Sequence, residues 1–134
     1  MSVTEFLRKA DFALEAAKRD LGAGDFDGAA NRLYYAMFHA ARAALLSNRP
    51  TRAGTTPNNN RTIIAQFGRH FCRNGPLPAE LGRAINEAQE LRIEGDYNAT
   101  TPDGAEVTSY IATAEQLLAA VKVIISRSPP APSD

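Results

Sequence analysis

Apolar residues recur every three or four positions along most of the chain, the pattern of helices that bury one face. The first segment shows this spacing clearly, with Phe6, Ala10 and Leu14 on one side. Further segments of this kind run from Asp25 to about Leu46, from Asn58–Asn60 to Asn74-Gly75, from Pro78 to about Ile93, and from Thr101-Pro102 to about Ile125. No segment alternates apolar and polar residues as a strand does. We therefore predict an all-α fold, an antiparallel up-and-down bundle of about five helices.

The chain has 134 residues, which is enough for one domain whose core folds without disulfides or a structural metal. We assign residues 1–127 to a single helical domain and expect the Pro-rich tail, residues 128–134, to be disordered. The connection over residues 47–59 is long and carries two arginines, so it is either mobile or ordered by a partner. Frequent charges near the N-terminus and the lack of a membrane-length apolar run predict a cytoplasmic protein without membrane contact.

The charges are unevenly distributed although 15 Lys and Arg balance 15 Asp and Glu. Seven arginines and no acidic residue lie between Asp27 and Glu80, so this segment carries +7 and the rest of the chain −7. Such asymmetry is typical of proteins that contact nucleic acid or phosphate. Arginine also outnumbers lysine twelve to three, and guanidinium suits bidentate phosphate contacts. A codon bias explains the arginine excess equally well.

Several classes of site are excluded by the residues present. A single cysteine, Cys72, rules out a disulfide framework and a multi-cysteine zinc site. Neither His39 nor His70 follows a glutamate by three residues, as a di-iron bundle requires. The glycine-rich phosphate loops GxxxxGK[ST] and GxGxxG are also absent. We therefore expect no metal and no cofactor.

A polar stripe is expected on the helix that begins near Asp25. Arg32, Tyr35, His39 and Arg42 follow one another at steps of three, four and three, opposite the expected core face. Arginine and tyrosine bind phosphate and histidine transfers protons, so Arg32, Tyr35 and Arg42 are candidate substrate-binding residues and His39 is a candidate catalytic residue. Alternatively, Tyr35 and His39 are half-buried packing residues with the two arginines solvated around them. Alanines between the stripe and the core allow another helix or a second subunit to approach closely.

An arginine continues the narrow apolar stripe of residues 81–88 on the next helical turn. At this position the guanidinium of Arg92 requires a partner, because an isolated buried charge is costly. If the helix continued past Gly95, Asp96 would stand one turn after Arg92, with Tyr97 next to it. Arg92 and Asp96 are therefore either a structural ion pair or the polar floor of a site.

Three stretches stand out when they are taken together: GDFDGAANRLYYAMFHAARAALL from Gly24 to Leu46, then FGRHFCRNGPLP, then ELRIEGDYN. In this combination the chain resembles the HEPN domain superfamily, specifically its small stand-alone prokaryotic members. The likeness covers almost the whole chain, and the first stretch is its most specific part. It implies an all-α up-and-down bundle that forms homodimers. It also implies the toxin of a two-gene module with a nucleotidyltransferase antitoxin, in which active members are metal-independent ribonucleases.

The ribonuclease motif of that superfamily is an arginine followed four to six residues later by a histidine, with two copies meeting at a dimer interface. Arg92 matches the arginine, but RIEGDYN holds no histidine and Asp96 stands in its place. An aspartate does not replace imidazole unless its pKa is raised. His39 would supply the imidazole if its helix lay beside Arg92. Tyr97 is the nearest candidate for the tyrosine that the partner enzyme nucleotidylates in related pairs.

Two hypotheses follow. The first is a homodimeric RNA- or nucleotide-binding protein of the toxin-like ribonuclease type. Its site would be centred on Arg92, Asp96 and Tyr97, with the polar stripe of residues 32–42 along the wall. The second is a catalytically inactive binding or scaffolding dimer in which Arg92 and Asp96 form a structural ion pair. The missing motif histidine favours the second hypothesis.

Overall fold

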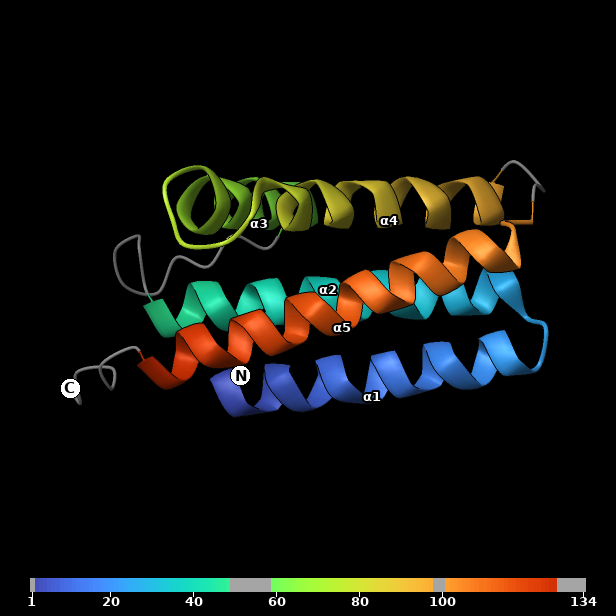
Figure 1. Cartoon of the computed structure of the whole chain (residues 1–134), viewed down its shortest axis with the longest axis horizontal. Coiled ribbons are helices and arrows are strands. Elements are labelled where there is room, and N and C mark those ends of the chain that lie inside the picture. The colour runs from blue at the N-terminus through green and yellow to red at the C-terminus, as the bar shows by residue number, and fades with distance from the viewer. Residues whose placement is uncertain (1, 49–58, 98–100, 128–134) are drawn as a thin grey trace.

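The computed structural model describes residues 2–48, 59–97 and 101–127, without the side chains of residues 95–97. Within these ranges the chain forms five α-helices, one short π-helix and no strand. In chain order they are α1 (Val3–Gly22), α2 (Phe26–Asn48), α3 (Asn60–Phe67), the π-helix η1 (Gly68–Arg73), α4 (Ala79–Tyr97) and α5 (Gly104–Arg127). The predicted all-α bundle is confirmed (Figure 1). The tail and most of the connection over residues 47–59 lie outside the described residues.

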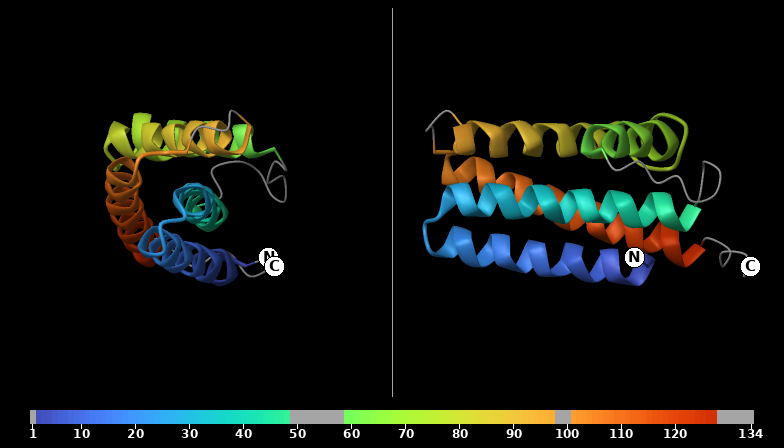
Figure 2. Two further views of the ribbon diagram at one scale, coloured as in Figure 1. Left: turned by 90° about the vertical axis from the view of Figure 1, so that its right-hand side faces the viewer. Right: turned by 180° about the vertical axis from the view of Figure 1, so that it is seen from behind.

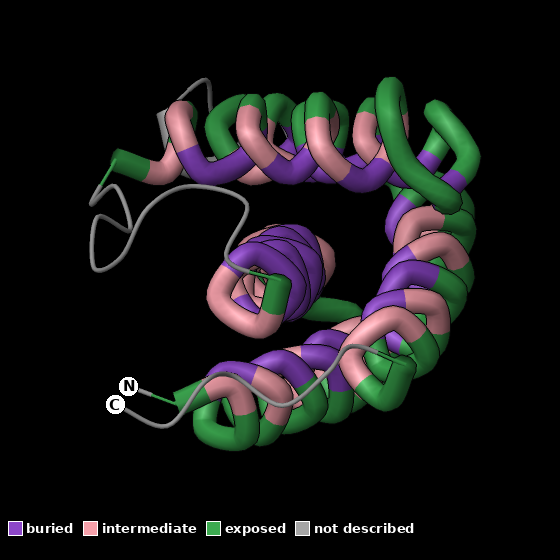
Figure 3. The backbone as a smooth tube through the Cα atoms, turned by 90° about the vertical axis from the view of Figure 1, so that its left-hand side faces the viewer, coloured by how far each residue is buried: buried purple, intermediate pink, exposed green. Residues whose placement is uncertain are grey.

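Helix α2 is the central helix of the bundle. Helix α1, helix α5 and the layer formed by α3 and α4 surround it on three sides (Figure 2). Its inward side chains Leu33, Tyr34 and Met37 have no exposed surface. No helix of the described ranges covers the fourth side of α2, and the half-buried part of α2 lies toward this open face (Figure 3).

Local hydrogen bonds set the starts of the first two helices. The Ser2 hydroxyl accepts from the Glu5 amide and the Glu5 carboxylate accepts from the Ser2 amide, both at 3.1 Å, so the two form a capping box. Asp25 caps α2 by accepting from the Gly28 amide at 2.9 Å. The turn between the helices passes through Gly24 at φ 80°, a conformation that glycine adopts without strain.

Three predicted helix boundaries differ from the structure. Helix α4 does not stop near Gly95 but continues to Tyr97, because one glycine costs a helix only about 1 kcal/mol relative to alanine. The third helix changes to π-helical hydrogen bonding at Gly68. Helix α5 begins at Gly104 rather than at Pro102, since Asp103 caps it by accepting from the Ala105 amide at 2.9 Å.

The alanines beside the polar stripe of α2 are buried by another helix of the same chain. Ala29, Ala36, Ala40 and Ala43 have no exposed surface. Helices α1 and α2 share the most extensive contact of any helix pair among the described residues. Helix α1 of the same chain is therefore the helix that packs against these alanines, because their short side chains let the two helix axes approach closely.

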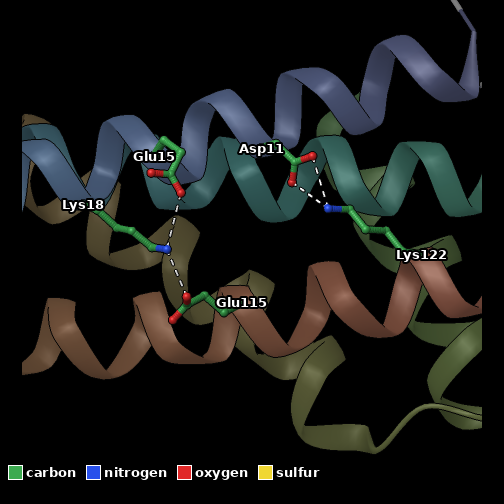
Figure 4. Close-up of polar contacts among 5 residues, drawn as sticks. All are labelled: Asp11, Glu15, Lys18, Glu115 and Lys122. Atoms are coloured by element: carbon green, nitrogen blue, oxygen red, sulfur yellow. Dashed lines mark hydrogen bonds and ion pairs between the residues drawn. The ribbon is translucent and has the colours of Figure 1, made fainter.

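Surface ion pairs join α1 to α5 on the outside of the bundle (Figure 4). The Lys122 ammonium lies 2.9 Å from the nearer Asp11 carboxylate oxygen. The Lys18 ammonium lies 3.0 Å from Glu115 and 3.4 Å from Glu15. These side chains are about half exposed, so each pair contributes at most about 1 kcal/mol to stability.

Helix α5 is the one described helix that is long and apolar enough to cross a membrane, by length and composition alone. Its buried residues pack into the core of the bundle; they are Val107, Ile111, Ala114, Leu117, Leu118 and Val121. Core helices of globular proteins commonly pass the same test, so the composition of α5 is only weak evidence for a membrane span.

Candidate functional site

A connected array of rings and cations runs along α2, from the buried Tyr34 to the half-buried Tyr35 and His39. The guanidinium carbon of Arg92, on α4, lies 4.9 Å from the ring centre of Tyr34 and 5.8 Å from that of Tyr35. The Tyr35 and His39 ring centres are 6.1 Å apart. Helix α2 therefore does lie beside Arg92, and both Arg92 and His39 border Tyr35. Sequence spacing predicted the stripe on α2, and packing of α4 brings Arg92 to it.

His39 is half-buried among aromatic rings. Its ring centre lies 6.1 Å from that of Phe6 and 5.8 Å from that of Phe38. Burial, together with the positive charges of Lys9 and Arg42, lowers the pKa of His39 to about 4. The imidazole is therefore neutral near pH 7. Its Nδ1 is buried and has no hydrogen-bond partner among the described residues.

Arg42 stacks on aromatic faces instead of extending into solvent. Its guanidinium carbon lies 4.6 Å from the ring centre of Phe6 and 5.8 Å from that of Phe38. Cation–π contacts of this kind contribute about 0.5–2 kcal/mol, depending on how far the cation is desolvated. Arg42 therefore links α2 to the start of α1 and holds positive charge close to His39.

A pocket of about 450 Å³ lies between α1 and α2. Helix α2 contributes Arg32, Tyr35 and His39 to its lining, and helix α1 contributes Lys9, Phe12 and Arg19 together with two alanines. Three cationic side chains and three aromatic rings of the described residues thus face one space. Phe12 is one of the exposed large apolar residues, at 66%.

The α1 side of this pocket is missing from the sequence predictions. Lys9, Phe12 and Arg19 are spaced so that they share one face of a helix, and this face differs from the buried one of Phe6, Ala10 and Leu14. An aromatic residue between two cations on a polar face is the pattern that could have identified them. Nothing in the sequence says that this face meets the stripe of α2.

Two other predicted site residues end helix α4. Asp96 and Tyr97 have helical backbone, four and five residues after Arg92, so Asp96 stands one turn farther along the same helix. Their side chains lie outside the described residues. The proposed ion pair of Arg92 with Asp96 and the modification of Tyr97 stay predictions.

The described residues contain no group of three or more His, Cys, Asp or Glu side chains arranged to hold a metal ion. Cys72 is half-buried beside Gly82, and this burial raises the pKa of its thiol. A neutral thiol is a poor nucleophile and a poor metal ligand. The chemistry available to the side chains around this pocket and Arg92 is therefore that of cations, aromatic rings and the neutral imidazole of His39.

Known proteins resemble this chain over most of its length. The model of the HEPN domain matches residues 3–124. A UPF0332 protein from Thermotoga maritima is 33% identical over 119 residues, which cover 88% of this chain and 86% of the relative. A protein named "Putative toxin" from Methanocaldococcus jannaschii is 30% identical over 107 residues, covering 80% of this chain and 69% of the relative. A UPF0332 protein from Gloeobacter violaceus is 36% identical over 93 residues, covering 69% and 70%. The chain belongs to the HEPN domain family.

Proposed function

We propose that this protein is a toxin-like HEPN domain that binds single-stranded RNA along the open face of α2. The observation that carries the proposal is the pocket in which Lys9, Arg19 and Arg32 lie with the rings of Phe12, Tyr35 and His39. Proteins bind single-stranded RNA by combining cations for the phosphates with aromatic faces for the bases. Two relatives from Methanocaldococcus jannaschii carry the word toxin in their names, which supports the toxin-like part of the proposal.

Cleavage of the bound RNA is the activity that we assign to Arg92 and His39. The neutral imidazole of His39 would take the proton of a ribose 2′-hydroxyl, whose oxygen then attacks the neighbouring phosphorus. Arg92 would stabilise the charge that develops on the phosphate oxygens. The 5′-oxygen leaves with a proton from water, so the products are a 2′,3′-cyclic phosphate and a 5′-hydroxyl. A bound phosphate beside His39 raises the pKa of the imidazole toward neutrality and makes it a better base.

The assembly that we propose for this activity is a cytoplasmic homodimer paired with a nucleotidyltransferase antitoxin. The support for it is membership of the HEPN family together with the face of α2 that no described helix covers (Figure 3). A second subunit on this face would place two copies of the array against each other.

A second candidate function is binding without cleavage. It is favoured by the pKa of His39 at about 4, since an imidazole with so low a pKa is a weak base near pH 7. The absence of a histidine between Arg92 and the end of α4 also favours it. In this case RNA occupies the same pocket and leaves intact.

Fluorescence anisotropy with a labelled single-stranded RNA tests the binding step. Replacing Arg32 with Gln is expected to weaken binding several-fold and to reduce the slope of log K against log salt by about 0.7, the value for one phosphate contact on a single strand. Phe12→Ala is expected to weaken binding through lost stacking, with the salt slope unchanged. Arg127→Gln, an exposed arginine at the end of α5, is the control. Equal binding by all variants would contradict the proposed site.

Incubation with total tRNA and a mixed single-stranded RNA pool in EDTA tests the cleavage step. We expect products with 2′,3′-cyclic phosphate ends, and we expect their loss in both Arg92→Ala and His39→Ala. Arg127→Ala should retain full cleavage, and thermal melting shows that each variant is folded. Intact RNA at high wild-type concentration, with binding retained, would establish the second candidate function instead.

A further inference from the structure

A second pocket, of about 510 Å³, lies between α3, η1 and α4, away from the site described above. Three arginines line it, Arg69 and Arg73 from η1 and Arg83 from α4. The side-chain amide of Asn86 also borders it, and among the described residues no acidic side chain does so. All three arginines are exposed, so their guanidinium groups are accessible to a ligand.

Gly82 of α4 lies in close contact with η1. A Cβ atom added to Gly82 would lie 3.1 Å from the sulfur of Cys72 and 3.6 Å from the Cα atom of Gly68. The absence of a side chain at Gly82 therefore lets η1 lie directly against α4, which brings the arginines of the two elements to one pocket. Burial raises the pKa of the Cys72 thiol, so this group stays neutral and leaves the positive charge of the pocket undiminished.

The surrounding acids compensate this charge only weakly. The Glu80 carboxylate lies 3.7 Å from Arg83, and both side chains are more than 60% exposed, so water screens this pair. Arg69 and Arg73 belong to the segment between Asp27 and Glu80 that contains no acidic residue. Concave surfaces of one charge sign focus the electrostatic potential and attract counter-charges. Guanidinium groups match phosphate oxygens in particular, because they form two parallel hydrogen bonds.

The pocket faces away from the first site. Arg83 and Arg92 are nine residues apart on α4, which is two and a half helical turns at 100° per residue, so their side chains leave opposite sides of the helix. The rise along the axis is about 14 Å at 1.5 Å per residue. A single RNA molecule that contacts both pockets must therefore pass around α4.

We propose that the pocket lined by Arg69, Arg73 and Arg83 is a second phosphate site, which holds the backbone of an RNA that also occupies the pocket between α1 and α2. This inference rests on the proposed RNA binding and adds a separate surface to it. The volume of about 510 Å³ lies within the range of small-ligand pockets. An acidic protein partner would instead need an interface of roughly 800 Å² on this chain.

The test compares two double variants that remove the same total charge. Arg69→Gln/Arg73→Gln and Arg8→Gln/Arg127→Gln each change the net charge by −2, and all four arginines are exposed. Binding of a labelled single-stranded RNA of about 20 nucleotides, long enough to contact two sites, is measured by anisotropy over a range of salt concentrations. We expect the first variant to bind about ten-fold more weakly, with a salt slope reduced by about 1.4, the value for two lost phosphate contacts. The second should bind within about two-fold of wild type.

Each other outcome overturns the inference in a recognisable way. Equal weakening by both double variants would mean that only net charge matters. Unchanged binding by Arg69→Gln/Arg73→Gln, with weakening by Arg19→Gln/Arg32→Gln, would leave the proposed function standing and refute the second phosphate site. A wild-type protein that binds no RNA would refute the proposed function and this inference together.

Discussion

Acidification should destabilise this protein through one residue, His39. Its pKa is about 4 in the folded chain, against 6.5 for an imidazole in water, chiefly because burial disfavours the charged form. Between these two pH values the unfolded chain binds a proton that the folded chain does not. The free energy of unfolding therefore falls as the pH falls through this window, and the contribution of His39 is fully present only above it.

The expected magnitude follows from the two pKa values. The difference between 6.5 and about 4 corresponds to about 3 kcal/mol once the pH is below both. Between about pH 7 and about pH 5 the loss is about 2 kcal/mol, because the unfolded imidazole is already protonated at the lower pH and the folded one is not. Since the ring is only half-buried, water screening reduces this value, and we expect about 1–2 kcal/mol.

Urea unfolding at both pH values isolates this contribution. Wild type should lose about 1–2 kcal/mol more than His39→Gln on going from about pH 7 to about pH 5, because glutamine does not titrate. His70→Gln, which replaces the other histidine of the chain on η1, is the matched control and should behave as wild type. Equal losses in wild type and His39→Gln would refute the reasoning, since the acid sensitivity would then come from other groups.

Two further predictions concern stability. Ile85→Ala should lower the free energy of unfolding by about 2–5 kcal/mol, because Ile85 has no exposed surface and its truncation leaves a cavity. Ile93, which is 38% exposed, is the control, and Ile93→Ala should lower the free energy of unfolding by under about 1 kcal/mol. Both values are measured by urea unfolding. Similar costs for both would contradict the assigned core. Lys122→Met should cost at most about 1 kcal/mol and match wild type in about 1 M salt, because its pair with Asp11 is half exposed. A larger, salt-independent loss in thermal melts would show that the pair is more than a surface contact.

The helices and their buried faces were predictable from local pattern. The apolar face of α2, including Leu33, Met37 and Leu45, is buried as its spacing predicts, because neighbours three and four residues apart share a face in any helix. The pattern predicts the end of α4 near Ile93, whereas the helix continues through Gly95 to Tyr97. A glycine weakens a helix by a small local amount, and such an amount does not decide where the helix ends.

The site was predictable only in part. The stripe of Arg32, Tyr35 and His39 is visible in the sequence because it lies on one helix. Lys9 and Phe12 were missed because they reach this stripe only through the packing of α1 against the alanines of α2. The same packing buries His39 against Phe6 and so lowers its pKa, an effect that no single helix contains.

Local sequence pattern is enough to establish that this chain forms amphipathic helices, which residues share a face of each helix, and where an arginine interrupts an apolar stripe. These properties depend on side chains within a few residues of one another. The tertiary structure alone decided that Arg92 lies against Tyr34 and Tyr35 and that the polar faces of α1 and α2 form one pocket. Both follow from how whole helices pack, and close packing is set by the combined shapes of side chains far apart in the chain.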